Sequence, residues 1–350
     1  MTIMVERLIK SIDGQKLQVH PTCFFLEWNH PSGPQATWLN REDIQKDKIV
    51  FSQYVKWTDL RYDVLLASDT LNASEDQFQV DIENQYRNVS FLKSHLQKVI
   101  RRSNSYKAIK TAWHFIDINL HDFLRRLAII AVEDCLPLDG YSILIWFMSA
   151  VSKGYILSNS QIAWCLGYVY DLSNCKYYEQ YPHRADDKLP TQREMRLFNL
   201  SPKGRDLVYS ILFRQSYGGM KSDKHMCRVA ALHWANRYHS KSRYLDMLKR
   251  SNIFITAPLV ELEKREWVLA ALDFHCCPNI IGAMWEKHDE YSEADIKSAI
   301  WHCSSSLTDK NLLSEDLLQR DVTNDKWQAI WKVIKKDFHG YAKFLLEKQG

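Results

Sequence analysis

The pattern of apolar residues changes near residue 91. From there apolar side chains recur at the spacing of one helix face, beginning with Phe91, Leu92, Leu96 and Ile100. Further stretches of this kind follow after short connections, at residues 108–115, 123–131, 143–151 and 158–170. Short connections between amphipathic helices are typical of helical bundles, so the pattern predicts a compact bundle over residues 91–178.

Residues 1–90 show a different pattern, with short apolar runs separated by turn-forming residues. Two of these runs flank Asp13-Gly14, a frequent hairpin turn. Along the same stretch we expect a strand at residues 23–28, a loop at 29–34, a short helix opened by Asn40 and irregular structure at 66–83. The sequence therefore predicts a small α+β N-terminal module.

The second half of the chain returns to helical spacing after an interruption. Residues 179–204 contain three prolines and many charges, which predicts a linker or long loop. The helices expected beyond it span residues 205–214, 227–239, 243–250, 260–275 and 296–303, the last one capped by Ser292, and a final helix carries an apolar stripe from Trp327 to Leu345. We therefore expect a helical C-terminal domain over residues 205–350 and a mainly α chain.

Composition limits the classes of protein to consider. The 12 Trp, 17 Tyr and 14 Phe provide ample core for a folded chain. A net charge of +4, from 46 basic and 42 acidic residues, is too balanced to indicate a nucleic-acid binder by itself. No apolar run is long enough to span a membrane, residues 1–10 lack the apolar core of a signal peptide, and the eight cysteines are irregularly spaced. We expect an intracellular protein that does not enter a membrane.

Motifs for common catalytic sites are missing from the sequence. It contains no phosphate-binding loop, since residues 218–222 lack the required glycines, and no nucleophile elbow or zinc-hydrolase motif. We therefore expect no catalytic residue and no cofactor.

Two segments with paired arginines stand out in the bundle region. Residues 93–104 carry Arg101 and Arg102, and residues 124–134 carry Arg125, Arg126, Glu133 and Asp134. Carboxylates at the end of a helix are unfavourable for its dipole, so we expect arginines to neutralise them. A bidentate arginine–carboxylate pair would hold two helices together. The alternative is an ordinary solvated or helix-locking ion pair.

These two segments resemble a known family. The pattern Ser94-His-Leu-Gln-Lys-Val-Ile-Arg-Arg, followed by Arg125-Arg-Leu-Ala-Ile-Ile-Ala-Val-Glu-Asp, is similar to the C-terminal region of clamp-loader-clade AAA+ ATPases of the MgsA/RarA type, relatives of the Werner-helicase-interacting ATPase. The resemblance covers about residues 90–178. It fades after Asp134, where Cys135-Leu-Pro-Leu-Asp-Gly replaces the family's Gly-Leu-Ala-Asp-Pro.

The resemblance implies a clamp-loader-collar-like oligomerisation domain, because this region holds the oligomer together in that family. The family's Walker motifs and arginine finger precede the region and have no counterpart here, so a scaffold without an ATPase module is implied. We therefore expect a non-catalytic scaffold or oligomerisation protein beside DNA replication or repair machinery, with a protein partner or self-association. The candidate assembly residues are Leu96, Ile100, Arg125, Arg126, Leu127, Ile130, Glu133 and Asp134.

Two other functions remain open. The first is nucleic-acid binding through basic residues, some beside aromatic residues that could stack bases: Arg101, Arg102, Lys241, Arg243, Lys249, Arg250, Lys335 and Lys336. The second is an enzyme with a site around His275 and His302, where the weak candidate metal ligands are His275, Cys276, Cys277, His302 and Cys303. A further acid–base group, more typical of a wet helix face, would be His114, Asp117, His121 and Asp122.

Overall fold

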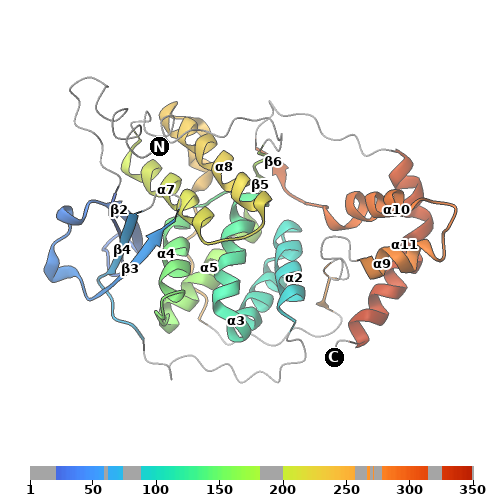
Figure 1. Ribbon diagram of the computed structural model, residues 1–350, viewed down its shortest axis with the longest axis horizontal. Helices are drawn as coiled ribbons and strands as arrows, with labels where there is room; N and C mark the ends of the chain where they lie inside the picture. The colour runs from blue at the N-terminus through green and yellow to red at the C-terminus, as the bar shows by residue number, and fades with distance from the viewer. Residues whose placement is uncertain are drawn as a thin grey trace.

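The fold is taken from a computed structural model. It describes residues 21–58, 62–73, 88–181, 200–256, 266–268, 271, 278–313 and 325–348. Within these ranges the chain is mainly helical with a small sheet at the N-terminal side, which confirms the expected class. Figure 1 shows the sheet at one end, α2 to α8 in the centre, and α9 to α11 at the other end.

The sheet has four strands, and it is larger than the sequence pattern suggested. The strands are β1 (Cys23–Glu27), β2 (Gln35–Leu39), β3 (Phe51–Trp57) and β4 (Tyr62–Ser68), in the order β2-β1-β4-β3. β1 and β4 are parallel, and the other pairs are antiparallel. The expectation of irregular structure from residue 66 is wrong, because β4 continues to Ser68 with its side chains buried.

Both faces of the sheet are covered. On one face Trp38 stacks on Phe24 at a centroid distance of 4.2 Å and meets the edge of Phe213 from α7 at 5.1 Å. On the other face, Cys23, Phe25, Leu65 and Ala67 form a small separate cluster. Between β2 and β3 lie η1 (Arg41–Asp43) and η2 (Lys46–Lys48), and the expected helix start at Asn40 is confirmed by its capping box.

The central helices follow the predicted apolar spacing. They are α2 (Val89–Arg101), α3 (Ser105–Glu133), α4 (Tyr141–Val151), α5 (Asn159–Asn174), α7 (Pro202–Ser216), α8 (Lys221–His239) and the 3-10 helix η4 (Arg243–Leu248). The stretches expected at residues 108–115 and 123–131 are the two arms of α3, which is kinked at Asn119. The Asn119 side chain caps the second arm by accepting from the Asp122 amide at 2.9 Å.

The C-terminal helices form a smaller group around α11. They are α9 (Pro278–Trp285), α10 (Glu293–Ile300), a π-helical turn η7 (Trp301–Ser305) and α11 (Asp325–Lys348). Ser292 caps α10 as expected, accepting from the Asp295 amide at 3.1 Å. The predicted stripe of the last helix is confirmed, since Ile330, Ile334 and Phe338 are buried. A short parallel pair, β5 (Tyr177–Tyr178) with β6 (Asn311–Leu312), joins this group to the bundle.

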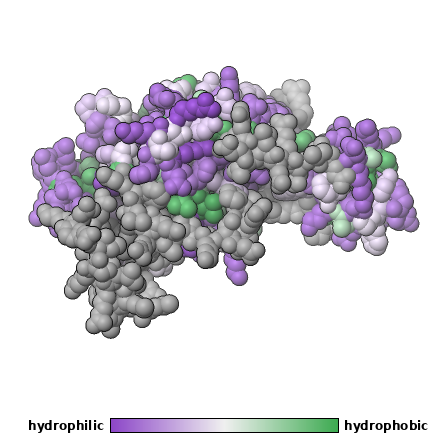
Figure 2. All heavy atoms as spheres, turned by 90° about the horizontal axis from the view of Figure 1, so that it is seen from above, coloured by the Kyte–Doolittle hydropathy of each residue, from purple (hydrophilic) through white to green (hydrophobic). Residues whose placement is uncertain are grey.

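The expected linker at residues 179–204 begins with buried residues and ends earlier than predicted. Glu179 and Tyr181 are buried against α8, and α7 already begins at Pro202. Residues 182–199 and the expected Asp13-Gly14 hairpin lie outside the described residues. In the part of the chain that the structure describes, no helix combines the length and apolarity needed to cross a bilayer. Among the residues that Figure 2 colours by hydropathy, this face is largely hydrophilic, with small hydrophobic areas.

Candidate functional site

The two arginine-bearing segments meet where α2 and α3 end. The Nε and Nη2 atoms of Arg101 lie 2.7 and 2.5 Å from Oδ1 of Asp134. The other Asp134 oxygen accepts from Gln97 Nε2 at 2.7 Å. Both charged side chains are buried, with 10% and 5% of their surface exposed. We call Arg101, Asp134 and Gln97 the arginine–carboxylate junction, and it confirms the predicted pairing of an arginine from α2 with a carboxylate after α3.

The other members of the two segments have different roles. Arg126 donates from Nη2 to Gln97 Oε1, and Gln97 also reaches Glu133 Oε2 at 3.2 Å. Desolvation by the surrounding protein, and then the charge of Asp134, raise the pKa of Glu133. Arg125 contributes its backbone carbonyl, which accepts from Arg214 Nη2 at 3.2 Å. We expected arginines to pair directly with these carboxylates. Gln97 instead links Arg126 to Glu133 and Asp134.

The junction also holds the segment that follows α10. Arg101 donates from Nη1 to the Ser305 carbonyl at 2.9 Å, and Arg102 donates from Nη2 to the Ser304 carbonyl at 2.8 Å. The Arg101 carbonyl in turn accepts from the Asp309 amide at 3.1 Å. These bonds satisfy backbone groups at the end of α2 and fix the chain that leads to the C-terminal helices.

A second contact between the bundle and this segment is made by Lys310. Its buried ammonium group donates to the carbonyls of Leu172, Ser173 and Cys175, at 2.9, 3.2 and 2.6 Å. These carbonyls lie at the end of α5, where a cation is favoured by the helix dipole. Sequence reasoning missed Lys310, because its partners lie more than a hundred residues away and leave no local pattern.

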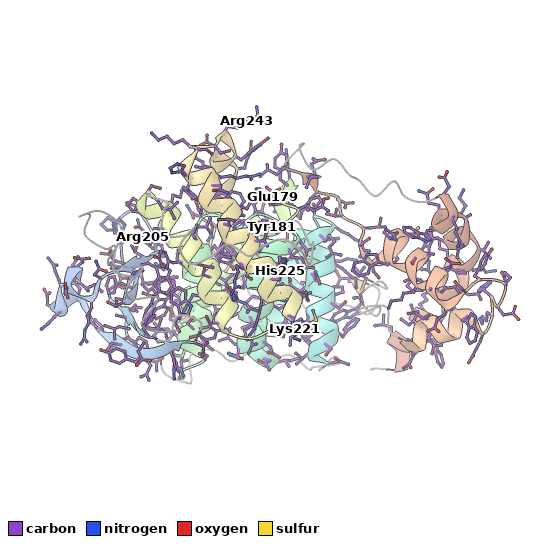
Figure 3. The ribbon with its side chains drawn as sticks, turned by 45° about the horizontal axis from the view of Figure 1, so that its top comes forward. Glu179, Tyr181, Arg205, Lys221, His225 and Arg243 are labelled. Atoms are coloured by element: carbon purple, nitrogen blue, oxygen red, sulfur yellow. The ribbon has the colours of Figure 1, made fainter. Side chains whose placement is uncertain are left out.

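A cavity of about 180 Å³ opens beside the junction. Its lining includes Arg101, Arg126 and Glu133 from the bundle, Met220 from the start of α8, and Trp301 from η7. Met220 and Trp301 are 49% and 39% exposed, so apolar surface flanks the charged floor. Figure 3 labels Lys221, which follows Met220 at this end of α8. The arrangement combines a rigid polar base with exposed apolar side chains.

The apolar assembly candidates belong to the interior of the chain. Leu96 and Ile100 of α2, and Leu127 and Ile130 of α3, have no exposed surface. They pack α2 against α3 and so offer no apolar surface to a second folded chain. They therefore act in the core, and the surface available for assembly must come from other residues.

The basic candidates lie in separate places. Lys241, Arg243 and Lys249 are exposed around the end of α8, where Figure 3 labels Arg243. Lys335 and Lys336 are exposed on α11, at the other end of the molecule in Figure 1. The remaining three are held in internal contacts, Arg101 and Arg102 at the junction and Arg250 within the bundle, where 1% of its side chain is exposed. The eight residues do not form one basic surface.

Among the described residues, the metal candidates that can be placed are His302 and Cys303. His302 stacks on Trp327 at a centroid distance of 4.0 Å, and Cys303 Sγ lies 3.8 Å from the Trp327 carbonyl. The other metal candidates, His275, Cys276 and Cys277, lie outside the described residues. Across the residues that the structure does describe, no group of three or more His, Cys, Asp or Glu side chains is placed to hold a metal ion.

The helical face expected for the acid–base group is also interrupted. His114 and Asp117 precede the kink at Asn119, whereas His121 and Asp122 follow it. The expectation of one continuous helix face is wrong, because non-helical backbone at Asn119 separates the two pairs. Asp122 is bound by Lys93, whose Nζ lies 2.9 Å from Oδ2.

One further polar cluster, not expected from the sequence, fixes β5 against α8. Glu179 is buried, with Arg237 Nη2 at 2.5 Å and His233 Nε2 at 3.2 Å. Tyr181 accepts from Trp234 Nε1 at 2.9 Å. Figure 3 shows Glu179 and Tyr181 beside α8. The cluster joins two elements of the bundle, so we assign it a structural role.

No family model, no curated protein and no solved structure matches this chain.

Proposed function

We propose that this chain is a non-catalytic scaffold that associates with a second copy of itself at the face beside the arginine–carboxylate junction. The observation that supports this proposal is the exposure of Met220 and Trp301 beside the buried charged residues of the junction. Aromatic residues, methionine and arginine are enriched at protein interfaces, and exposed lysines and acids are depleted there.

The hydrogen bonds within the arginine–carboxylate junction favour association at this face. Arg101 and Asp134 are buried and doubly bonded to each other, and Gln97 is held by Arg126 and Asp134. A pre-ordered surface loses less conformational entropy on binding than a mobile one. Trp301 follows α10 directly and begins the helical turn whose Ser305 carbonyl the junction binds.

The resemblance of residues 90–178 to the MgsA/RarA-type collar supports the same proposal. In that family the equivalent helical region holds the oligomer together, and the present chain would retain this role without the motor. Association with DNA replication or repair machinery is part of the proposal, and it rests on this resemblance alone.

Photo-crosslinking tests the proposal at single-residue resolution. Trp301 is replaced by p-benzoylphenylalanine in the full chain, and Trp285 on α9, which is 48% exposed, is replaced in a matched control. Irradiation should give a covalent dimer from the first variant and little from the second. Equal yields from both variants, or no dimer from either, would show that the junction face is not the interface.

A further inference from the structure

A second and larger cavity, of about 720 Å³, lies between the sheet and the helices. Its wall is formed by β2 with the loop before it, by the starts of α4 and α7, by the end of α8, and by residues 248–254. Arg205, labelled in Figure 3, marks the beginning of α7 on this side. Pockets for small molecules usually have volumes of about 300–1,000 Å³, so this cavity has the size of a ligand site.

Arg250 places an incompletely bonded guanidinium group at the cavity wall. Its Nε lies 2.8 Å from Asp171 Oδ2, and its guanidinium carbon lies 4.7 Å from the Trp164 ring centroid and 5.2 Å from that of Tyr168. The side chain is 1% exposed, yet among the described residues Nη1 and Nη2 have no hydrogen-bond partner. Stacking uses the faces of the guanidinium and leaves the in-plane N–H groups free to donate.

Leaving these two nitrogens without an acceptor is unfavourable. A buried donor that lacks a partner costs about 1–3 kcal/mol, and more when it is charged. Buried polar groups are almost always bonded to protein or to an ordered molecule. Since Arg250 lines the cavity, an acceptor for Nη1 and Nη2 can come from the cavity.

The N-terminus of α4 lies next to the guanidinium group of Arg250. Gly140 is the N-cap of α4, with a φ of +91°, and it supplies no side chain to cap the first turn. A Cβ atom at Gly140 would lie 3.2 Å from Arg250 Nη1 and 2.9 Å from Trp164 Cζ2, so glycine permits this close approach. Ser142 and Ile143 of the first turn also line the cavity. The positive end of the helix dipole and Arg250 therefore converge on one place.

The carboxylates in the wall are already engaged. Asp139 Oδ2 lies 2.7 Å from Lys203 Nζ at the rim. Asp206 accepts from the Trp38 amide at 2.7 Å, and burial raises its pKa to about 7, which reduces its negative charge. Asp171, behind the wall, is bonded to Nε of Arg250 and to Ser251. Among the described residues, Nη1 and Nη2 thus remain buried donors without an acceptor at the cavity wall.

We propose that this cavity binds a small molecule with an oxyanion group, a phosphate or a carboxylate, between the Nη atoms of Arg250 and the first turn of α4. Tyr238 and Phe254 line the same cavity and offer aromatic surface to the organic part of the ligand. The site shares no residue with the junction face. A test of ligand binding at this site therefore does not depend on the outcome for self-association.

Matched probes distinguish the two kinds of oxyanion. The full chain is titrated with phenyl phosphate, benzoate and neutral phenol, and binding is followed by calorimetry. We expect at least one anion to bind and phenol not to bind. Binding of phenyl phosphate alone identifies a phosphate site, and binding of benzoate alone a carboxylate site. Absence of binding by both anions up to about 10 mM overturns the proposal, as does equal binding of phenol.

Variants and hydrogen exchange locate the bound probe. Arg250→Lys keeps a cation beside Asp171 and removes the two Nη donors of the guanidinium group, so the affinity for the anion should fall by about tenfold or more. Lys249→Met, at the exposed neighbouring residue, should leave it unchanged. Exchange of the wild-type amides provides a readout that does not depend on folding of the variant: the bound anion should slow exchange in residues 140–144. Unchanged exchange there, or unchanged affinity in Arg250→Lys, would contradict the site.

Discussion

Replacing Arg101 with methionine tests whether the junction stabilises the fold. Arg101→Met leaves the Asp134 carboxylate buried with Gln97 as its remaining partner and removes the bond to the Ser305 carbonyl. Removing one partner of a buried ion pair typically costs about 3–5 kcal/mol, because the other charge stays desolvated. The lost bond to Ser305 adds about 1 kcal/mol. We therefore expect a loss of roughly 5 kcal/mol in the free energy of unfolding.

An exposed ion pair supplies the control. Lys249 and Asp246 lie 2.9 Å apart with 72% and 74% of their side chains exposed, so Lys249→Met should leave the free energy of unfolding nearly unchanged. Urea unfolding followed by far-ultraviolet circular dichroism gives the midpoint for each variant. A double variant, Arg101→Met with Asp134→Leu, removes both charges and should be more stable than Arg101→Met alone. The reasoning is refuted if Arg101→Met behaves like Lys249→Met, or if the double variant is the least stable.

Two further perturbations address other parts of the fold. Lys310→Met removes the donors at the end of α5, so residues 304–313 should exchange hydrogen and be cleaved by protease faster than in wild type, and unchanged rates would contradict the role of Lys310. Burial lowers the pKa of His95 from 6.5 to about 3, so its stabilising contribution is complete above pH 6.5 and falls by up to about 1.4 kcal/mol per pH unit below it. His95→Gln should flatten that pH dependence in thermal unfolding, whereas a substitution of the exposed His239 should not.

Elements set by local pattern could be predicted from the sequence. The helical spacing of Leu96, Ile100, Leu127 and Ile130 predicted the central helices, because apolar residues at this spacing lie on one face of a helix and are buried together. Caps at Asn40 and Ser292 were also found, since the bonds they make span three residues. β4 was missed, because a strand buried on both faces lacks the alternation that identifies one.

Contacts between distant segments could not be predicted in this way. Arg101 meets Ser305 across 204 residues, and no local pattern encodes that approach. Lys249 and Arg250 are adjacent in the sequence and both basic, yet one is exposed and the other is buried on Trp164 and Asp171. Their difference depends on the path of residues 248–254 past α5, which the residue types themselves do not determine.

Light scattering of the full chain measures self-association most directly. With increasing concentration the wild-type mass should rise above 41.2 kDa towards a whole multiple of it, and Trp301→Ala should return the mass to 41.2 kDa while Trp285→Ala does not. A wild-type mass that stays at 41.2 kDa over a thousandfold range of about 0.1–100 μM would contradict assembly through the junction face.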